Sequence, residues 1–186
     1  MSWLTTEQLS AMGFKKLGRD VRISDRAAIY NPERIEIGDY SRIDDFCVVS
    51  GTITIGRNVH ITVQCNLAGG SPGITMEDFS CLAYACQVFA QSDDYSGRTM
   101  TNSTVPSQYK AEFKKAVHIG RHCIVGTAAI IMPGITLAEG CSVGAHALVT
   151  KSTEPWGIYV GQPARRIKAR KQDLLALEQK YLSEPR

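Results

Sequence analysis

The sequence lacks any long hydrophobic run and any strong imbalance of charge. No segment approaches the roughly 20 apolar residues that cross a membrane, and the opening stretch MSWLTTEQLSAMGFKK has no apolar run long enough for a secretory signal. Lys and Arg exceed Asp and Glu by only 21 to 18, a surplus too small to indicate a nucleic-acid partner. We therefore expect a cytoplasmic chain with no membrane and no nucleic-acid partner.

Paired cysteines are also missing. The chain has six cysteines but no Cys-x-x-Cys pair, and nothing in it indicates an oxidising compartment. Disulfides and a zinc site are therefore not expected, and no metal cofactor is predicted. Cysteine as a small buried hydrophobic residue is the better interpretation.

What the sequence does contain is an aliphatic residue at almost every sixth position. A helix repeats at 3.6 residues and a strand at 2, so a period of six indicates a chain that turns a corner every six residues. Short parallel strands around a triangular prism, about 18 residues per coil, satisfy this pattern and predict an all-β parallel β-helix of hexapeptide repeats. Position one of each hexad is occupied by Ile37, Ile43, Val49, Ile55, Ile61, Leu67, Met76, Leu82, Val88, Ile119, Val125, Ile131, Leu137, Val143 and Val149.

The same numbering places the other residues of the hexads. Position five holds mostly small side chains, which predicts a tight buried site: Ser41, Cys47, Cys65, Ser80, Cys86, Cys123, Ala129, Cys141 and Ala147. Cys81 falls at position six and is expected to face solvent. The histidines should all point away from the core, since His60 and His118 are at position six and His122 and His146 at position four. For the last two, an ordinary surface location is expected.

Four segments depart from the repeat, two within it and one at each end. A Gly- and Pro-containing insertion, AGGSPG, predicts a loop at a prism corner, and the polar stretch of about 91–115 predicts a long loop with a functional role. The stretch TTEQLSAMG predicts a short N-terminal helix, because Thr5 and Gln8 have the spacing of a capping box. The leucines of QDLLALEQKYL predict an amphipathic C-terminal helix. We therefore expect a β-helix domain over 1–170 and a terminal helix over 171–186.

Two groups of motifs carry a family resemblance that extends from Phe14 to Leu182. The segment IGRHCIVGTAAIIMPGITLAEGCSVGAHALVTKS, followed by IYVGQPARRIKARK, resembles the hexapeptide acyltransferases, which share a left-handed β-helix, trimeric assembly and use of acyl-CoA. The stretches AIYNPERIEIGDYSRIDDFCVVSG, VHI, SDDYSG and VPSQYK more narrowly resemble the N-acyltransferases of dTDP-4-amino-4,6-dideoxyglucose in viosamine and anthrose biosynthesis. The resemblance implies transfer of an acyl group to the C4 amine for O-antigen or other surface polysaccharide.

The residues agree with amine chemistry. In related sugar O-acetyltransferases a loop histidine deprotonates a hydroxyl, and this chain has no histidine between 61 and 117. A sugar amine is partly nucleophilic near neutral pH and needs positioning instead. The resemblance implies this role for Asp93, with Asp94 and His60 as further candidate catalytic residues and Tyr30 and Asp44 as substrate-binding residues. The alternative for the two loop aspartates is initiation of a turn with Ser96 and Gly97.

Acyl-CoA requires a slot for its pantetheine arm and cations for its phosphates. Small residues at outward corners, Gly126 with Thr127 and Gly144 with Ala145, are expected to let the arm approach the backbone. The basic run at 165–171 supplies charge for the phosphates, and we predict contacts from about two of its cations, with Arg166, Lys168 and Arg170 as candidates. Acetyl-CoA is the expected donor, although the anthrose enzymes take a longer acyl group.

The sequence also predicts an assembly and leaves three other functions open. Outward groups such as Val59, Val63 and Ile124 and a cofactor slot with one wall predict a homotrimer with sites between subunits. The alternatives are a sugar or glycan O-acetyltransferase, a γ-type carbonic anhydrase and a trimeric scaffold without activity. The carbonic anhydrase needs three converging histidines, and His118 with His122 is the only close pair.

Overall fold

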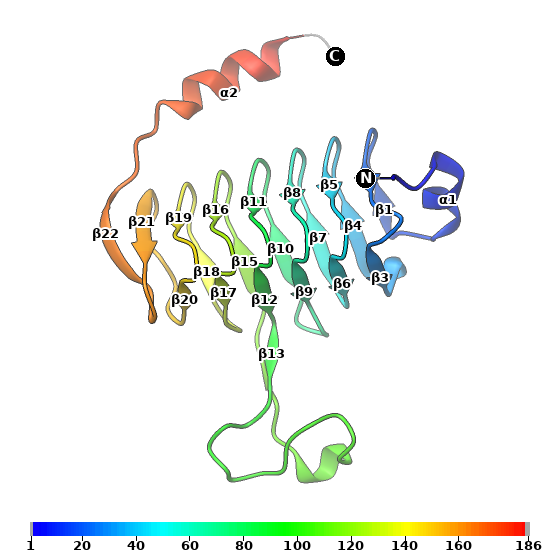
Figure 1. Ribbon diagram of the computed structural model, residues 1–186, viewed down its shortest axis with the longest axis vertical. Helices are drawn as coiled ribbons and strands as arrows, with labels where there is room; N and C mark the ends of the chain where they lie inside the picture. The colour runs from blue at the N-terminus through cyan, green and yellow to red at the C-terminus, as the bar shows by residue number, and fades with distance from the viewer. Residues whose placement is uncertain (1, 185–186) are drawn as a thin grey trace.

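Three parallel β-sheets form the faces of a triangular prism, with α1 beyond the N-terminal end of the coils and α2 lying alongside them (Figure 1). The computed structural model describes residues 2–184. The prediction of an all-β, left-handed parallel β-helix is confirmed. The chain visits the three sheets in turn, so each sheet gains one strand per coil.

The strands are short, as a period of six requires. The first sheet contains β1 (Lys16–Leu17), β4 (Ile35–Ile37), β7 (Ile53–Ile55), β10 (Ile74–Met76), β15 (Val117–Ile119) and β18 (Thr136–Leu137). The second contains β2 (Arg22–Ile23), β5 (Arg42–Ile43), β8 (His60–Ile61), β11 (Cys81–Leu82), β16 (Ile124–Val125), β19 (Ser142–Val143), β21 (Gly157–Val160) and β22 (Arg165–Ala169). The third contains β3 (Ala28–Tyr30), β6 (Val48–Ser50), β9 (Asn66–Ala68), β12 (Gln87–Phe89), β17 (Ile130–Ile131) and β20 (Leu148–Val149).

Position one fills the core of the prism. Ile43, Ile61, Leu82 and Val125 stand in register in successive strands of the second sheet, and none is more than 1% exposed. Stacked aliphatic side chains in this column remove apolar surface from water in every coil, which is the main favourable term for such a fold. The hexad numbering predicted from sequence is therefore the numbering of the folded coils.

Position five is buried as predicted, but it is not restricted to small side chains. The thiols of all five cysteines at this position are free and buried. Where the chain enters the first sheet, the same position holds larger aliphatic residues: Ile35, Ile53, Ile74, Val117 and Ile135. Val59 also occupies position five and is 1% exposed. The prediction that it faces outward was wrong, because it belongs to the buried column.

The corners depend on a left-handed backbone conformation at position four. Phe46, Gln64 and Ala85 turn from the second sheet to the third with φ of 60°, 64° and 57°. A side chain other than glycine in this conformation costs about 1–2 kcal/mol, so each coil offsets strain at its corners by burial in the core. These turns could not be predicted from the sequence, since they are made by ordinary residues.

The three corners differ in what covers them. The α2 corner joins the first sheet to the second and includes Asn58, Phe79 and His122, over which α2 (Leu174–Ser183) lies (Figure 1). The loop corner joins the third sheet to the first and carries the long loop. The open corner joins the second sheet to the third and carries neither element.

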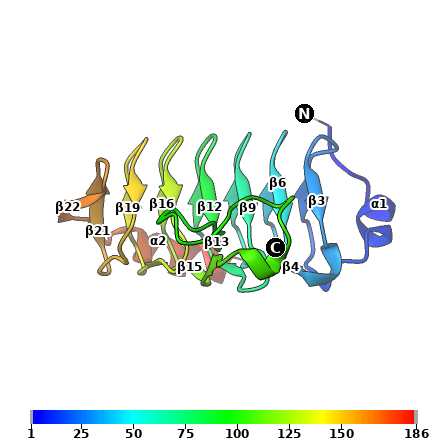
Figure 2. The ribbon, with the colours of Figure 1, turned by 90° about the horizontal axis from the view of Figure 1, so that it is seen from below.

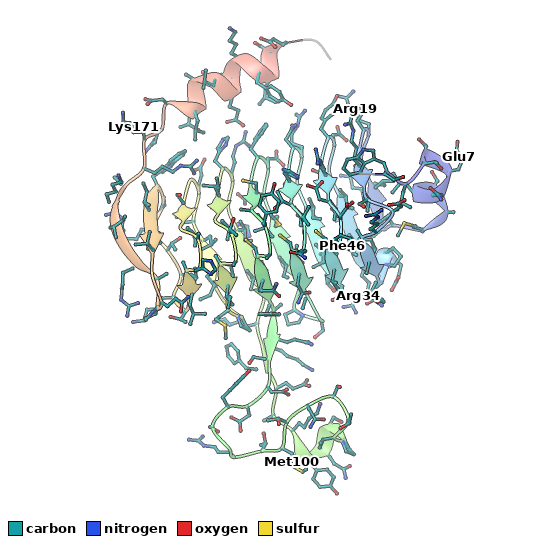
Figure 3. All side chains as sticks on the ribbon, viewed as in Figure 1. Glu7, Arg19, Arg34, Phe46, Met100 and Lys171 are labelled. Atoms are coloured by element: carbon teal, nitrogen blue, oxygen red, sulfur yellow. The ribbon has the colours of Figure 1, made fainter. Side chains whose placement is uncertain are left out.

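The long loop projects from the prism through a two-stranded stem (Figures 1 and 2). β13 (Gln91–Ser92) pairs antiparallel with β14 (Phe113–Lys114), and a short 3-10 helix, η2 (Ser107–Tyr109), lies in the distal part. Met100, far from the coils in Figure 3, is 56% exposed. The predicted loop boundaries agree with this stem.

The terminal segments also agree with the sequence. α1 (Thr6–Ala11) begins with the predicted capping box, in which Thr5 and Gln8 each bond the other's main-chain N–H. A second 3-10 helix, η1 (Pro32–Arg34), connects two coils, and β22 runs antiparallel to β21 before the chain reaches α2. Within residues 2–184, no helix has the length and apolar character needed to span a membrane.

Candidate functional site

A straight row of residues follows position one of the second sheet along the open corner. The main-chain N–H of each donates to a carbonyl in the next coil, at 2.8 to 3.1 Å, which keeps the row in register. The row consists of Asp44, Thr62, Ala83, Gly126 and Gly144. Several candidate site residues predicted from sequence therefore lie on one edge of the prism, although they are up to 100 residues apart along the chain.

The two glycines of this row are required by packing between coils. A Cβ at Gly126 would lie 2.6 Å from the Ala145 nitrogen, and one at Gly144 would lie 2.9 Å from Cγ1 of Val160. The missing side chains of these glycines therefore make room for the next coil. Thr127 and Ala145, beside them, are exposed at the open corner. Their predicted role in binding acyl-CoA stays a prediction.

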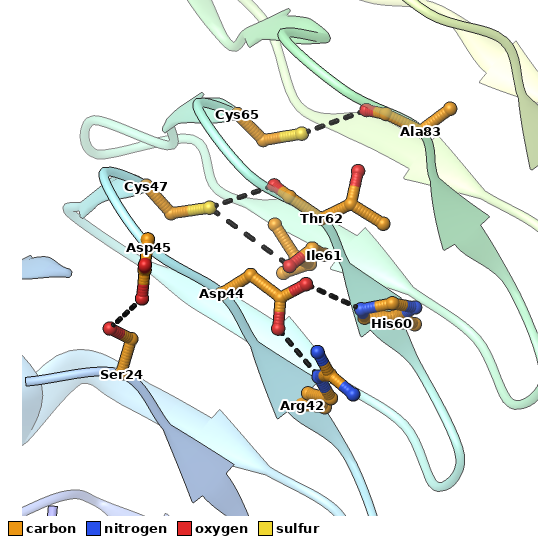
Figure 4. A network of polar contacts seen from close by, with 10 residues as sticks. All are labelled: Ser24, Arg42, Asp44, Asp45, Cys47, His60, Ile61, Thr62, Cys65 and Ala83. Carbon is orange, nitrogen blue, oxygen red and sulfur yellow. Dashed lines mark hydrogen bonds and ion pairs between the residues drawn. The ribbon is translucent and has the colours of Figure 1, made fainter. Parts of the chain in front are cut away.

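A buried carboxylate organises the N-terminal part of the same edge (Figure 4). The Asp44 side chain is 5% exposed and accepts from Nε of Arg42 at 2.5 Å, while its other oxygen lies 3.0 Å from Nε2 of His60. The Arg42 guanidinium also stacks on the ring of Trp3. With Nε2 turned to Asp44, Nδ1 is the ring nitrogen of His60 left for another partner. His60 itself is half-buried, so its ring is still accessible to a ligand, and its role in the site stays a prediction.

The two loop aspartates have different surroundings. Asp94 accepts from the N–H groups of Ser96 and Thr99 at 2.8 and 3.1 Å, and hydrogen bonds from these residues lower its pKa to about 2. Asp94 therefore makes the turn that was the alternative interpretation. Asp93 accepts one long hydrogen bond, 3.3 Å from the Asn102 N–H, and lines a polar pocket of about 220 Å³ with Glu112. Its carboxylate keeps most of its hydrogen-bonding capacity.

Within one chain, the structure does not bring Asp93 close to His60 or Asp44. Asp93 follows β13 at the loop corner, whereas His60 and Asp44 lie on or beside the second sheet next to the open corner. Tyr30 ends β3 on the third sheet and is 58% exposed. The candidate residues thus occupy at least two edges of the prism.

The basic C-terminal residues divide into exposed and structural ones. Arg166 and Lys168 project from β22 and are exposed. Arg170 is partly buried, and its Nη1 donates to the carbonyls of His122 and Gly140 at 2.7 and 3.0 Å. The guanidinium of Arg170 therefore already has partners within the protein, and Arg166 and Lys168 are better placed for a phosphate.

His122 is not the surface histidine that its hexad position predicted. It is 8% exposed, stacks on Phe79 at 5.3 Å and lies 3.0 Å from Oε2 of Glu178 in α2. Burial lowers its pKa, and the nearby Arg121 guanidinium adds to this effect. The prediction failed because α2 folds back over the corner, a contact that the coil repeat does not encode.

The other two histidines and Cys81 complete this comparison. His118 bonds Glu77 at 3.1 Å, and His146 is exposed as predicted. Cys81, expected to face solvent, is half-buried in a cavity of about 480 Å³ beneath α2, and burial raises the pKa of its thiol. His118 and His122 have separate carboxylate partners. Over residues 2–184, no group of three or more His, Cys, Asp and Glu side chains is arranged to hold a metal ion.

Sequence reasoning missed Trp3 and Glu178. Trp3 reaches the second sheet through an isolated bridge to Ser24, for which the sequence carries no signal. Glu178 could have been identified from the sequence, because its spacing from Leu174 and Tyr181 puts all three on one helix face. All three line the cavity beneath α2.

Known proteins resemble this chain over nearly its whole length. It is 38% identical over 181 residues to a dTDP-4-amino-4,6-dideoxy-D-glucose acyltransferase of Escherichia coli, covering 96% of this chain and 94% of the relative. It superposes with a TM-score of 0.96 on a serine-to-alanine variant of AntD, an N-acyltransferase from Bacillus cereus, in complex with dTDP-4-amino-4,6-dideoxyglucose and coenzyme A. The identity there is 44%, over 97% of each chain. AntD in complex with dTDP and 3-hydroxybutyryl-CoA gives the same TM-score at 43% identity, covering 97% of this chain and 96% of AntD. No protein-family model matches the sequence.

Proposed function

The chain belongs to the dTDP-4-amino-4,6-dideoxyglucose N-acyltransferase family, and on this premise we propose that it transfers an acyl group from acyl-CoA to the C4 amine of dTDP-4-amino-4,6-dideoxy-D-glucose. The observation that carries the proposal is the 38% identity to an enzyme of this activity over 96% of the chain. In the reaction, the amine nitrogen attacks the thioester carbon, the C–S bond breaks, and the amide and the free thiol of CoA are the products.

Asp93 is the residue we assign to the amine. Its carboxylate has one long internal hydrogen bond, so it can accept from the amino group and orient the nitrogen lone pair toward the thioester. It also favours the positive charge that develops on nitrogen during attack. The proton then passes to the departing sulfur of CoA or to His60, whose Nδ1 is turned away from Asp44.

The acyl-CoA arm is assigned to the C-terminal half of the open corner. Thr127 and Ala145 are exposed there, and Arg166 and Lys168 on β22 supply cations for the phosphates. The acetyl group is the proposed acyl group. AntD in complex with 3-hydroxybutyryl-CoA makes the four-carbon thioester the competing donor to compare.

The proposed site is completed in a homotrimer. The loop corner and the open corner lie on different edges of one prism, so the loop of one subunit would meet the open corner of the next in a closed threefold arrangement. Exposed apolar side chains on the loop, Tyr95 at 92%, Met100 at 56% and Phe113 at 55%, are suited to such a contact.

Mixing two inactive variants tests this arrangement. Asp93→Asn disables the loop and Thr127→Trp blocks the open corner at an exposed position. If each site combines two subunits, refolding the two variants together in equal amounts should restore about a quarter of wild-type activity, because about one site in four then pairs two intact parts. No recovery in trimers shown to be mixed by mass spectrometry would place both residues in one subunit's site.

We also propose a cytoplasmic reaction in surface polysaccharide biosynthesis. The product keeps its dTDP group and is therefore an activated donor that a glycosyltransferase can use. A gene deletion that leaves the polysaccharide with a free 4-amino sugar would support this assignment, and an unchanged polysaccharide would refute it.

Direct measurement of activity tests the proposed function. Purified protein is incubated with the dTDP and UDP forms of 4-amino-4,6-dideoxyglucose and with acetyl-CoA or 3-hydroxybutyryl-CoA, and product masses are recorded. We expect a gain of one acetyl group on the dTDP sugar. Absence of any acylated amino sugar with either donor would refute the proposal.

A further inference from the structure

Three buried thiols line the inner side of the open corner. Each stands at position five of a hexad, and each donates to the main-chain carbonyl of the row residue in the next coil (Figure 4 shows the first two). The bonds are Cys47 to Thr62 at 2.9 Å, Cys65 to Ala83 at 3.0 Å and Cys86 to Gly126 at 3.1 Å. The proposed mechanism does not use these thiols.

An inward carbonyl fixes the direction of the N–H that follows it. In a planar trans peptide the C=O and the next N–H point in opposite directions. The thiol contacts therefore leave the N–H groups of Val63, Tyr84 and Thr127 directed away from the core. None of the three N–H groups has a hydrogen-bond acceptor among residues 2–184, and Tyr84 and Thr127 are exposed. Together they form an outward row of donors.

At the α2 corner, some of the equivalent N–H groups are paired with carboxylates. At position three there, the N–H of Arg19 donates to Asp39 at 3.0 Å, that of Arg57 to Asp78 at 2.8 Å and that of Arg121 to Glu77 at 2.8 Å. Carboxylates from neighbouring coils thus satisfy these three donors, whereas the N–H groups of Asp39, Asp78 and Glu139 at the same corner have no acceptor among residues 2–184. The row residues and their neighbours at 62–63, 83–84 and 126–127 include no acidic side chain. Because Tyr84 and Thr127 are exposed, their N–H groups can meet an acceptor of a bound ligand.

We propose that Cys47, Cys65 and Cys86 are positioning residues that hold the carbonyls of the open-corner row inward, so that the N–H groups of Val63, Tyr84 and Thr127 stay directed at bound substrate. Coils are spaced about 4.8 Å apart, so the row presents one donor at each step along the prism.

The acceptors are oxygens of the two substrates, an assignment that rests on the proposed function. The Thr127 N–H lies at the C-terminal end of the row, toward the exposed cations of β22. There it would donate to an amide or thioester carbonyl of acyl-CoA. Val63 lies at the N-terminal end, toward His60 and Asp44, where the nucleotide sugar would bind. Cys86 should therefore affect mainly acyl-CoA, and Cys47 mainly the nucleotide sugar.

Cys86→Ala is the decisive variant. It removes the thiol at a position of the hexad that also holds Ala129 and Ala147, so the coil should tolerate alanine. Cys86→Ser restores a donor. Cys123→Ala is the matched control, since Cys123 makes the same contact, 3.1 Å to the Ala138 carbonyl, at the α2 corner. The measurements are the dissociation constant for CoA by calorimetry, KM and kcat for acyl-CoA, and the melting temperature of each variant.

Cys86→Ala should weaken CoA binding about 3- to 10-fold, the size of one lost hydrogen bond, and raise KM for acyl-CoA more than it lowers kcat. Cys86→Ser should recover at least half of this loss. Cys123→Ala and Cys47→Ala should leave the CoA constants unchanged at a similar loss of stability. Equal CoA binding in all four variants, or equal weakening by Cys123→Ala, would overturn the inference.

The calorimetry separates this result from the proposed function. If wild-type protein binds CoA but acylates no amino sugar, the proposed function fails and the cysteine comparison is still decided by affinity. If wild-type protein does not bind CoA, the donor row has no acyl-CoA to hold and the inference fails as well.

Discussion

Replacing Asp93 by asparagine removes a charge while preserving shape, and the loop should tolerate it. The Asp93 carboxylate makes one contact of 3.3 Å with a main-chain N–H, and the asparagine oxygen can keep that bond. Asp94, in contrast, holds the turn through Ser96 and Thr99. The unfolding temperature of Asp93→Asn should therefore stay close to that of the wild type.

The effect on catalysis should be large. Loss of one preorganised electrostatic group costs about 2–4 kcal/mol of transition-state stabilisation, so kcat/KM for the amino sugar should fall about 30- to 1000-fold. The assay follows release of the CoA thiol at varied amino sugar and saturating acyl-CoA.

Two further variants, Asp94→Asn and His60→Asn, test whether this loss comes from the charge of Asp93. Asp94→Asn should loosen the loop and lower the melting temperature of the protein more than Asp93→Asn does. Its loss of kcat at saturating substrate should be smaller than that of Asp93→Asn. If Asp93→Asn keeps near-wild-type kcat/KM while His60→Asn loses it, the wrong residue has been assigned to the amine. If both variants stay active, amine positioning by a side chain is the wrong mechanism.

Three further predictions address stability and the donor. Because burial lowers the pKa of His122, the unfolded chain takes up the proton first, so the melting temperature should be constant above about pH 6.5 and fall below it; His122→Gln should flatten this dependence, and an unchanged slope would contradict it. Replacing Arg166 and Lys168 together by alanine should raise KM for acyl-CoA at least 5-fold at low salt, with a smaller difference at high salt; equal KM values at low salt would argue against phosphate contacts. Thr5→Ala should destabilise the N-terminal helix by about 1 kcal/mol in denaturant melts, and no change would show that the capping box contributes little.

The coil repeat was predictable because each position of the hexad has a fixed environment. Ile61 and Leu82 had to be buried once the period of six was recognised, and Cys47 and Cys86 followed from their shared position. The same rule placed the members of the open-corner row on one edge.

What could not be predicted depends on contacts outside the repeat. His122 is buried only because α2 returns over the corner, and Arg170 is occupied because it caps carbonyls of two coils. The separation of Asp93 from His60 within one chain depends on which corner carries the loop. The sequence shows where the loop interrupts the repeat but not what the loop contacts.

The most direct test is a choice between an amine and a hydroxyl at C4. Wild-type protein receives equal amounts of dTDP-4-amino-4,6-dideoxyglucose and dTDP-6-deoxyglucose, which carries a C4 hydroxyl, together with acetyl-CoA and 3-hydroxybutyryl-CoA. Products are identified by mass spectrometry and NMR. The account predicts an amide at C4 of the amino sugar and no ester on the hydroxyl sugar. Ester formation at a comparable rate would contradict it and favour a sugar O-acetyltransferase.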